Sequence, residues 1–326
     1  AVSFALAVAT QGGVASVPLL YVLTAVGACF SALDNPTRAS LAPTLVERRL
    51  IRAAMALNQT IFQFALVFGS VVAGIVIARF GLAGAYWLDV LSFVASFIAV
   101  WLLRPPPRAA VERQPVLRSL VEGIRYLGVT RILMATMSLD FLATFFGSPR
   151  ALFPYYADRV FHVGPEGLGL LYASMGAGAL VAAVASGWTA RVRRQGLVIL
   201  IAVAVWGVSI AVFGFLDERW FVLALVLLAI ANGADAVSSI FRGTILQTVV
   251  PDALRGRLNS INIMFVLGGP QLGQFESGAV AALWSPVAAV VTGGVACVAS
   301  VFAIAAWIPE IARLRVHRDD IAPAAD

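Results

Sequence analysis

Four carboxylates stand inside stretches of sequence that are otherwise apolar, where an acidic side chain can bind and release protons. They are Asp89, which we interpret as structural, and the candidates Asp140, Asp235 and Glu276. Near the centre of a bilayer such a group costs about 2.5 to 3.5 kcal/mol on insertion scales, so each should face a protein interior, water or a charged partner. Asp140 is our first candidate for a proton carrier, and Glu276 is the second. The alternative for each is a neutral carboxyl group that is hydrogen-bonded within a helix bundle.

Arginines accompany two acidic residues at the spacing of a helix face. Asp34 and Arg38 are four residues apart, and Asp235 and Arg242 are seven apart. Both spacings place the two side chains on one face of a helix. They predict a charge latch at a cytoplasmic gate, and the alternative is a helix-end ion pair that only orients a loop. The candidate latch residues are Asp34, Arg38, Arg242, Arg255 and Arg257.

Several other kinds of chemistry lack the residues that they need. The sequence contains no Lys, which removes the Lys of a P-loop nucleotide site and of Schiff-base chemistry. Cys29 and Cys297 stand in apolar stretches, and the two His residues are far apart in the sequence. This pattern indicates neither a metal cluster nor a disulfide framework. We therefore predict no cofactor, no metal site and no enzymatic activity.

The composition places the chain in a lipid bilayer. Hydrophobic residues make up 60% of it and charged residues 12%, and the mean hydropathy is +0.91. Several apolar runs approach the roughly 20 residues that a helix needs to cross about 30 Å of hydrocarbon, and they lack the alternation of barrel strands. We predict an all-α membrane protein with about ten transmembrane helices. The apolar runs are 1–10, 15–33, 59–79, 84–103, 132–149, 167–188, 196–216, 219–240, 261–283 and 286–308.

Arginine alone determines the predicted orientation, because all 23 basic residues are Arg. Most lie in loops on one side of the membrane, and the other side has only Arg79, Arg150, Arg159 and Arg219. By the positive-inside rule, the arginine-rich loops and the C-terminus are cytoplasmic, with Arg242 at the membrane surface. The net charge of +6 therefore reflects topology, and no basic patch interleaved with aromatic residues indicates nucleic-acid binding. We expect a multi-pass protein of the inner cell membrane.

An internal repeat divides the chain into two related halves. Residues 37–58 align with residues 241–262 at an offset of 204, which places Arg38 on Arg242 and Asn58 on Asn262. Matched polar residues in register with the helical pattern indicate a repeat. The fifth and sixth apolar runs would have partners only before residue 1, so we expect two further helices there.

The predicted organisation has four parts. Prolines at the start of the linker end the preceding helix, and PVLRSLVEGIRYLGVTR then places apolar residues on one helical face. This pattern is typical of an interfacial helix along the inner leaflet, and a surface helix packed on the bundle is the alternative. The parts are a first transmembrane half at 1–103, the linker at 104–131, a second transmembrane half at 132–308 and a cytoplasmic tail at 309–326.

Four stretches of the sequence resemble a known family of membrane proteins. They are ALDNPTRASLAPTLV (32–46), FFGSPRALFPYYADRVF (145–161), GLGLLYASMGAGALVAAVASGW (167–188) and DAVSSIFRGTILQTVVPDALRGRL (235–258). The sequence is similar to the major facilitator superfamily, in the branch of enterobactin, macrolide and drug exporters. The plan of that superfamily is two parallel six-helix repeats related by an axis along the membrane normal. The resemblance implies helices 3–6 in the first half and 7–12 in the second.

The resemblance also implies a function, that of a secondary transporter working by alternating access. It implies a monomeric antiporter in the lipid bilayer that exports small amphiphilic molecules, such as siderophores or drugs, in exchange for protons. The same fold and carboxylates would also support uptake by symport, and a non-transporting receptor or scaffold is a further alternative. No residue pattern identifies the substrate.

Small residues at matching positions of the two halves predict close helix contacts. Gly69 and Gly74 align with Gly273 and Gly278 at the same offset of 204. Such contacts could slide as the protein changes between inward-open and outward-open states, or they could be static packing. The candidate helix-packing residues are Gly69, Gly74, Gly269, Pro270, Gly273 and Gly278.

Overall fold

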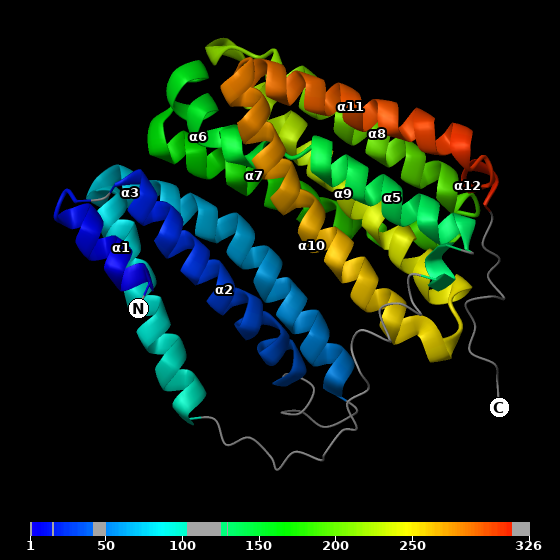
Figure 1. Ribbon diagram of the computed structural model, residues 1–326, viewed down its shortest axis with the longest axis horizontal. Helices are drawn as coiled ribbons and strands as arrows, with labels where there is room; N and C mark the ends of the chain where they lie inside the picture. The colour runs from blue at the N-terminus through cyan, green and yellow to red at the C-terminus, as the bar shows by residue number, and fades with distance from the viewer. Residues whose placement is uncertain (1, 15, 42–49, 103–124, 129, 315–326) are drawn as a thin grey trace. The chain divides into compact units, whose positions relative to one another are not determined.

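The computed structural model describes residues 2–14, 16–41, 50–102, 125–128 and 130–314. Within these ranges the chain is helical and contains no strand, which confirms the predicted all-α architecture (Figure 1). The chain divides into two compact units. The first is Ala1–Val111 with Gly164–Leu170, and the second is Glu112–Val163 with Leu171–Asp326.

The first unit contains α1 (Val2–Gln11), α2 (Val17–Leu41) and α3 (Ile51–Leu102). α1 packs against both α2 and α3 (Figure 1). Its contact with α3 includes a hydrogen bond that Trp87 Nε1 donates to Gln11 Oε1 at 3.0 Å. The ring of Trp87 also meets that of Phe4 edge to face, with centroids 5.6 Å apart. One tryptophan thus joins α3 to both ends of the short α1.

α3 is broken at Gly81. This residue has φ 69° and ψ −178°, a backbone conformation that is essentially restricted to glycine. The apolar stretch Phe64–Leu102 has 39 residues and would be about 58 Å long as one straight helix, nearly twice the hydrocarbon thickness of a bilayer. The break divides it into two segments of membrane-spanning length, which correspond to the predicted runs 59–79 and 84–103.

The second unit is a bundle in which α5 is central. α5 contacts α8, α9, α10 and α11, and α8 lies beside both α9 and α11 (Figure 1). α5 also begins the most buried of the candidate membrane spans. The long helices of this unit are α5 (Arg131–Phe146), α7 (Gly164–Val184, its first turns belonging to the first unit), α8 (Gln195–Gly214), α9 (Phe221–Val249), α10 (Asp252–Leu283) and α11 (Pro286–Trp307).

Short helical turns follow α5 and close one end of the bundle with aromatic side chains. They are η3 (Pro149–Leu152), α6 (Phe153–Tyr155) and η4 (Tyr156–Val160). The buried rings of Phe153 and Tyr156 lie 6.1 and 4.8 Å from the ring of Phe213 on α8. The hydroxyl of Tyr156 donates to the carbonyl oxygen of Gly214 at 3.2 Å, which satisfies the polar end of an otherwise buried ring.

Six helical segments of the described chain are long and apolar enough to cross a membrane. One of them is the pair of segments joined at Gly81, and α10 is not among the six although it has 32 residues. Charged residues and the amides Asn259, Asn262, Gln271 and Gln274 lower the hydropathy of α10, and α1 is short at 10 residues. The membrane fold is therefore confirmed, and the count of ten spans stays a prediction.

Helix boundaries agree with the predicted repeat. α2 begins at Val17 and α9 at Phe221, which is 204 residues later. The segment of α3 after Gly81 begins at residue 82, and α11 begins 204 residues later, at Pro286. The turn at Gly81 therefore corresponds to the junction between α10 and α11. Helix starts that recur at one constant offset are what a duplicated sequence produces.

Some predictions fall outside the described residues. The predicted interfacial helix is largely at 103–124, of which nothing is described, and Arg125–Gly128 alone is described as helical. The tail is described as far as residue 314, through the short α12 (Glu310–Arg313). The division into a linker and a tail stays a prediction.

Candidate functional site

Close helix contacts fix the position of α5 against two neighbours. A Cβ atom added to Gly269 of α10 would collide with Thr144, and one added to Gly273 would collide with the backbone of Phe145. On α11, a Cβ at Gly293 would collide with the carbonyl oxygen of Phe146. Glycine at these three positions lets the backbones approach more closely than any other residue would. The C-terminal half of α5 is thereby held firmly between α10 and α11.

Asp140 is buried in the middle of this helix. Its side chain is 3% exposed. It is the tenth residue of α5, about 14 Å from the helix start at 1.5 Å per residue. The hydroxyl of Thr144 donates to the backbone carbonyl oxygen of Asp140 at 2.8 Å, so this threonine leaves the carboxylate free for another partner.

That partner is Arg242 of α9. Its Nη2 atom lies 2.7 Å from Oδ1 of Asp140, and the arginine side chain is 10% exposed. A distance this short is typical of a charge-assisted hydrogen bond. The pair joins α5 to α9 inside the bundle, where water does not screen the two charges.

Two further side chains of α9 contact the same guanidinium group. Arg242 Nη1 donates to the hydroxyl oxygen of Ser238, one turn earlier, at 2.9 Å. Nη2 lies 3.5 Å from Oδ1 of Asp235, and this oxygen is buried and makes no hydrogen bond. The contact with Asp235 is therefore electrostatic, at a length beyond an ordinary hydrogen bond. We call these four residues, Asp140, Asp235, Ser238 and Arg242, the charge cluster.

The charge cluster is an unusual arrangement for stability alone. A buried ion pair is often no more stabilising than well-packed apolar residues, whereas removal of one partner typically costs about 3 to 5 kcal/mol. In this cluster one arginine faces two carboxylates, and Arg150 adds a further positive charge within electrostatic range of Asp235. Ionisable groups placed in this way inside membrane bundles usually belong to ion or proton pathways.

Comparison with known proteins identifies the family. A family model described as a transmembrane secretion effector, MFS_3, matches residues 1–324. The chain belongs to this family. The predicted resemblance to the major facilitator superfamily is thus confirmed.

Relatives of this secretion-effector chain include proteins named enterobactin exporter EntS from Shigella boydii serotype 18 and from Escherichia coli strain SMS-3-5. Each is 28% identical to it over 275 residues, which cover 84% of this chain and 65% of the relative. The matched region thus spans less than two thirds of the length of these relatives. A solved structure described as that of a bacterial metal transporter has a TM-score of 0.66, with 16% identity over 94% of this chain and 79% of that one. The structural similarity shows the fold.

Arg242 lies within a helix, and its predicted position at the cytoplasmic membrane surface stays a prediction. The apolar run ends near residue 240, but α9 continues to Val249 and carries Arg242 into the bundle. Within this extension the helix itself satisfies the threonine hydroxyl groups: Thr244 donates to the carbonyl oxygen of Ile240 and Thr248 to that of Thr244, at 2.9 and 3.0 Å. Hydroxyl groups satisfied in this way do not interrupt a membrane helix.

The other latch candidates do not join the charge cluster among the described contacts. Asp34 and Arg38 lie on α2, and their side chains are outside the described part of the structure, as is that of Arg255. Arg257 is half-buried near the start of α10 and has an interaction of its own. The latch role of these four residues stays a prediction.

Glu276, the second candidate proton carrier, lies near the end of α10. It is half-buried, and its Oε2 atom makes no hydrogen bond in the described chain. The neighbouring Ser277 donates to the carbonyl oxygen of Ser148 at 3.4 Å, which joins α10 to the turn after α5. α10 begins at Asp252 rather than near residue 261, so Glu276 is farther along its helix than the apolar run indicated.

The remaining helix-packing candidates differ in their surroundings. A Cβ at Gly74 would lie 3.1 Å from Cα of Gly169, both in the first unit, whereas Gly69 and Gly278 have no described atom within 4 Å of such a Cβ. Pro270 interrupts the hydrogen bonds within α10, and Gln274 Nε2 donates to its carbonyl oxygen at 3.2 Å. A sliding role for these residues stays a prediction.

Two residues of interest were not singled out from the sequence. Ser238 reads as one more small residue of a transmembrane helix, and only its place between Asp235 and Arg242 on one helix face would have indicated its contact. Arg150 was assigned to the outer side of the membrane, yet it is half-buried in η3 within electrostatic range of Asp235. The hydroxyl of Tyr172 donates to the carbonyl oxygen of Arg150 at 3.2 Å, which anchors this turn to α7.

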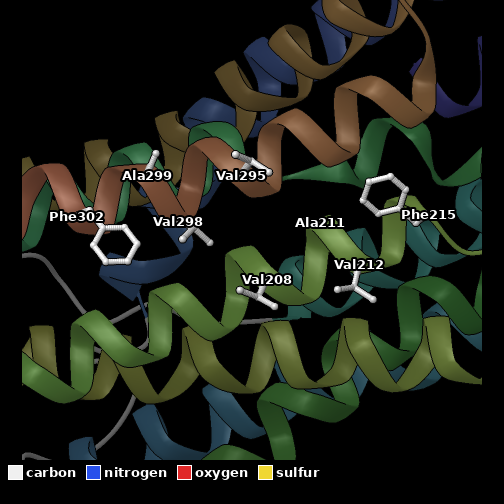
Figure 2. A pocket seen from close by; sticks show the side chains of 8 residues that line it. All are labelled: Val208, Ala211, Val212, Phe215, Val295, Val298, Ala299 and Phe302. Atoms are coloured by element: carbon white, nitrogen blue, oxygen red, sulfur yellow. The ribbon is translucent and has the colours of Figure 1, made fainter.

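A groove on the bundle surface contrasts with the charge cluster. It lies between α8 and α11, has a volume of about 440 Å³, and is lined wholly by apolar side chains, as Figure 2 shows. It therefore offers no charge or hydrogen bond to orient a ligand, and its exposed valines and phenylalanines suit contact with lipid. In the described ranges no group of three potential metal ligands is found. The charge cluster is thus the candidate functional site.

Proposed function

We propose that this chain performs proton-coupled export of small amphiphilic molecules by alternating access. It would act as a monomer in the inner membrane, with the arginine-rich loops and the C-terminus in the cytoplasm. Membership of a family of transmembrane secretion effectors supports the proposal, as do relatives that are named enterobactin exporters. Those names favour export over uptake by symport and over a receptor or scaffold.

The observation that carries proton coupling is the ion pair between Asp140 and Arg242, at 2.7 Å. Two opposite charges at about this distance attract each other by on the order of 4 to 6 kcal/mol at an effective dielectric constant of about 20. A proton bound to Asp140 removes this attraction, because the neutral carboxyl no longer holds the guanidinium. Loss of the proton restores it.

The ion pair joins two different helices, so its state affects how they pack. With Asp140 ionised, α5 and α9 are tied together at this depth. With Asp140 protonated, the tie is released and the contact between the two helices can change. Alternating access needs such a two-state contact between helices, biased by binding of the coupling ion. The proton gradient would drive this cycle, and the exported molecule would move in the opposite direction.

The proposal is tested with the complete protein in proteoliposomes. Enterobactin and a lipophilic dye, ethidium, are two suitable probes. Transport of at least one of them, driven by an imposed proton gradient, should be at least about tenfold faster than without the gradient, and a proton uncoupler should abolish the difference. Gradient-independent movement of both probes would contradict proton-coupled export.

A further inference from the structure

Arg242 faces two carboxylates at unequal distances. Its Nη2 atom is 2.7 Å from Asp140 Oδ1 and 3.5 Å from Asp235 Oδ1, a difference of 0.8 Å. Its other terminal nitrogen, Nη1, is held by Ser238 at 2.9 Å. A small rotation of the guanidinium group about the contact with Ser238 would shorten one Nη2 distance and lengthen the other.

We propose that Asp235 is the alternate partner of Arg242 in the transport cycle. When Asp140 binds a proton, Arg242 moves its ion pair to Asp235, so that the guanidinium is paired in both states. This inference rests on the proposed function, because it assumes that Asp140 is the group that takes up the proton. It names Asp235 and Ser238 as positioning residues of that site.

The unequal burial of the two carboxylates favours this exchange. Arg242 is 10% exposed and cannot exchange a lost partner for bulk water, so an unpaired state would be costly. Asp235 is 34% exposed, and its buried oxygen Oδ1 has no hydrogen-bond donor. An acceptor without a donor lies next to a cation that needs an acceptor whenever Asp140 becomes neutral. Moving Arg242 to Asp235 satisfies both groups.

Other titratable groups on the surrounding elements do not replace Asp235 in this role. Arg131 on α5 pairs with Glu310 of α12 at 3.8 Å, with both side chains largely exposed. Arg150 is itself positively charged and cannot form an ion pair with Arg242, and it adds a positive charge within electrostatic range of Asp235. α8 carries no titratable side chain. Other titratable groups on neighbouring elements are Glu166 and Tyr172 on α7, Asp252, Arg255, Arg257 and Glu276 on α10, and Cys297 on α11.

Among the described residues, few acidic groups interact with the charge cluster. Asp140 interacts electrostatically with Arg242 and Asp235, whereas Glu276 has no described ion pair with any member of the cluster. The thiol of Cys297 is directed to the carbonyl oxygen of Val203, at 3.8 Å. Within the described chain, Asp235 is thus the acidic group that Arg242 already faces besides Asp140.

The first test is a set of unfolding measurements on the complete protein in mixed micelles. Asp140→Asn and Asp235→Asn each leave Arg242 with one carboxylate, and each should raise the unfolding equilibrium constant by less than about tenfold. The double variant leaves Arg242 without either. It should raise the constant at least tenfold more than the product of the single effects. Addition of Arg242→Gln should then restore most of the loss, because the unpaired cation is removed.

If the effects of the two single variants simply multiply, and Arg242→Gln gives no rescue, the proposal that both carboxylates share Arg242 is overturned. The proposal is also overturned if Asp140→Asn alone is as destabilising as the double variant. Asp158→Asn is the matched control, because Asp158 pairs with Arg159 at 3.1 Å where both side chains are more than 70% exposed. It should change the constant by less than about fivefold.

The second test separates this inference from the proposed function. Asp235→Asn should reduce proton-gradient-driven transport of ethidium or enterobactin in proteoliposomes at least fivefold, while exchange of the same probe without a gradient stays within twofold. If Asp140→Asn abolishes gradient-driven transport but Asp235→Asn transports normally, the proposed function stands and the exchange of partners is overturned. If Asp140→Asn itself retains full gradient-driven transport, both are overturned.

Discussion

Replacing Arg242 by Gln should destabilise the protein far more than removing an exposed arginine. The substitution keeps a hydrogen-bonding side chain, shorter than that of Arg by two atoms, and removes the charge that pairs with Asp140 at 2.7 Å. Breaking a buried ion pair typically costs about 3 to 5 kcal/mol. We expect about 3 kcal/mol, the lower end of that range, because Asp140 is then able to bind a proton. This corresponds to a change of roughly 150-fold in the unfolding equilibrium constant.

The assay is equilibrium unfolding of the purified complete protein in mixed micelles, followed by tryptophan fluorescence. Arg159→Gln is the control, because Arg159 forms an exposed pair with Asp158 at 3.1 Å, and exposed pairs contribute about 0 to 1 kcal/mol. A double variant, Arg242→Gln with Asp140→Asn, should regain part of the loss, since it no longer buries a lone carboxylate. The reasoning is refuted if Arg242→Gln costs no more than Arg159→Gln.

Three further substitutions test the helix contacts around the site. In the same unfolding assay, Gly273→Ala should destabilise the protein by about 1 to 3 kcal/mol, because its Cβ would collide with the backbone of Phe145. Gly278→Ala is the control and should be neutral or slightly stabilising, because no described atom lies within 4 Å of the new Cβ. Gly81→Ala should cost about 1 to 3 kcal/mol through strain at φ 69°, measured as a lower melting temperature in detergent. Ser238→Ala should change the free energy of unfolding by less than about 1 kcal/mol but slow proton-driven transport severalfold, because Arg242 loses the contact at 2.9 Å that holds its Nη1 atom. Unchanged transport would count against a positioning role for Ser238.

Much of the fold could be predicted because it depends on patterns that are local in the sequence. Run lengths and composition predicted the helices, and the repeat at an offset of 204 predicted matched boundaries, including those of α2 and α9. The break at Gly81 was visible as a gap between two apolar runs. These features follow from the length of a bilayer-spanning helix and from the conformational freedom of glycine.

The charge cluster was predicted only in part. The spacing of Asp235 and Arg242 indicated that they share a face of one helix, and the structure brings them together at 3.5 Å. The shorter contact between Arg242 and Asp140 could not be predicted, because the two residues lie on different helices and their pairing depends on how α5 and α9 pack. The length of α9 was missed as well, since the polar threonines after residue 240 resemble a loop until their hydroxyl groups are seen to bond within the helix.

The role of Asp140 as the proton carrier is tested most directly by one transport measurement. Asp140→Asn in the complete protein, reconstituted in proteoliposomes, is compared with the parent for gradient-driven movement of a transported probe and for exchange of the same probe without a gradient. We predict that the variant folds and retains exchange within about threefold, while gradient-driven transport falls at least tenfold, because the amide cannot bind and release the proton that controls the contact with Arg242. Full gradient-driven transport by Asp140→Asn would contradict this role.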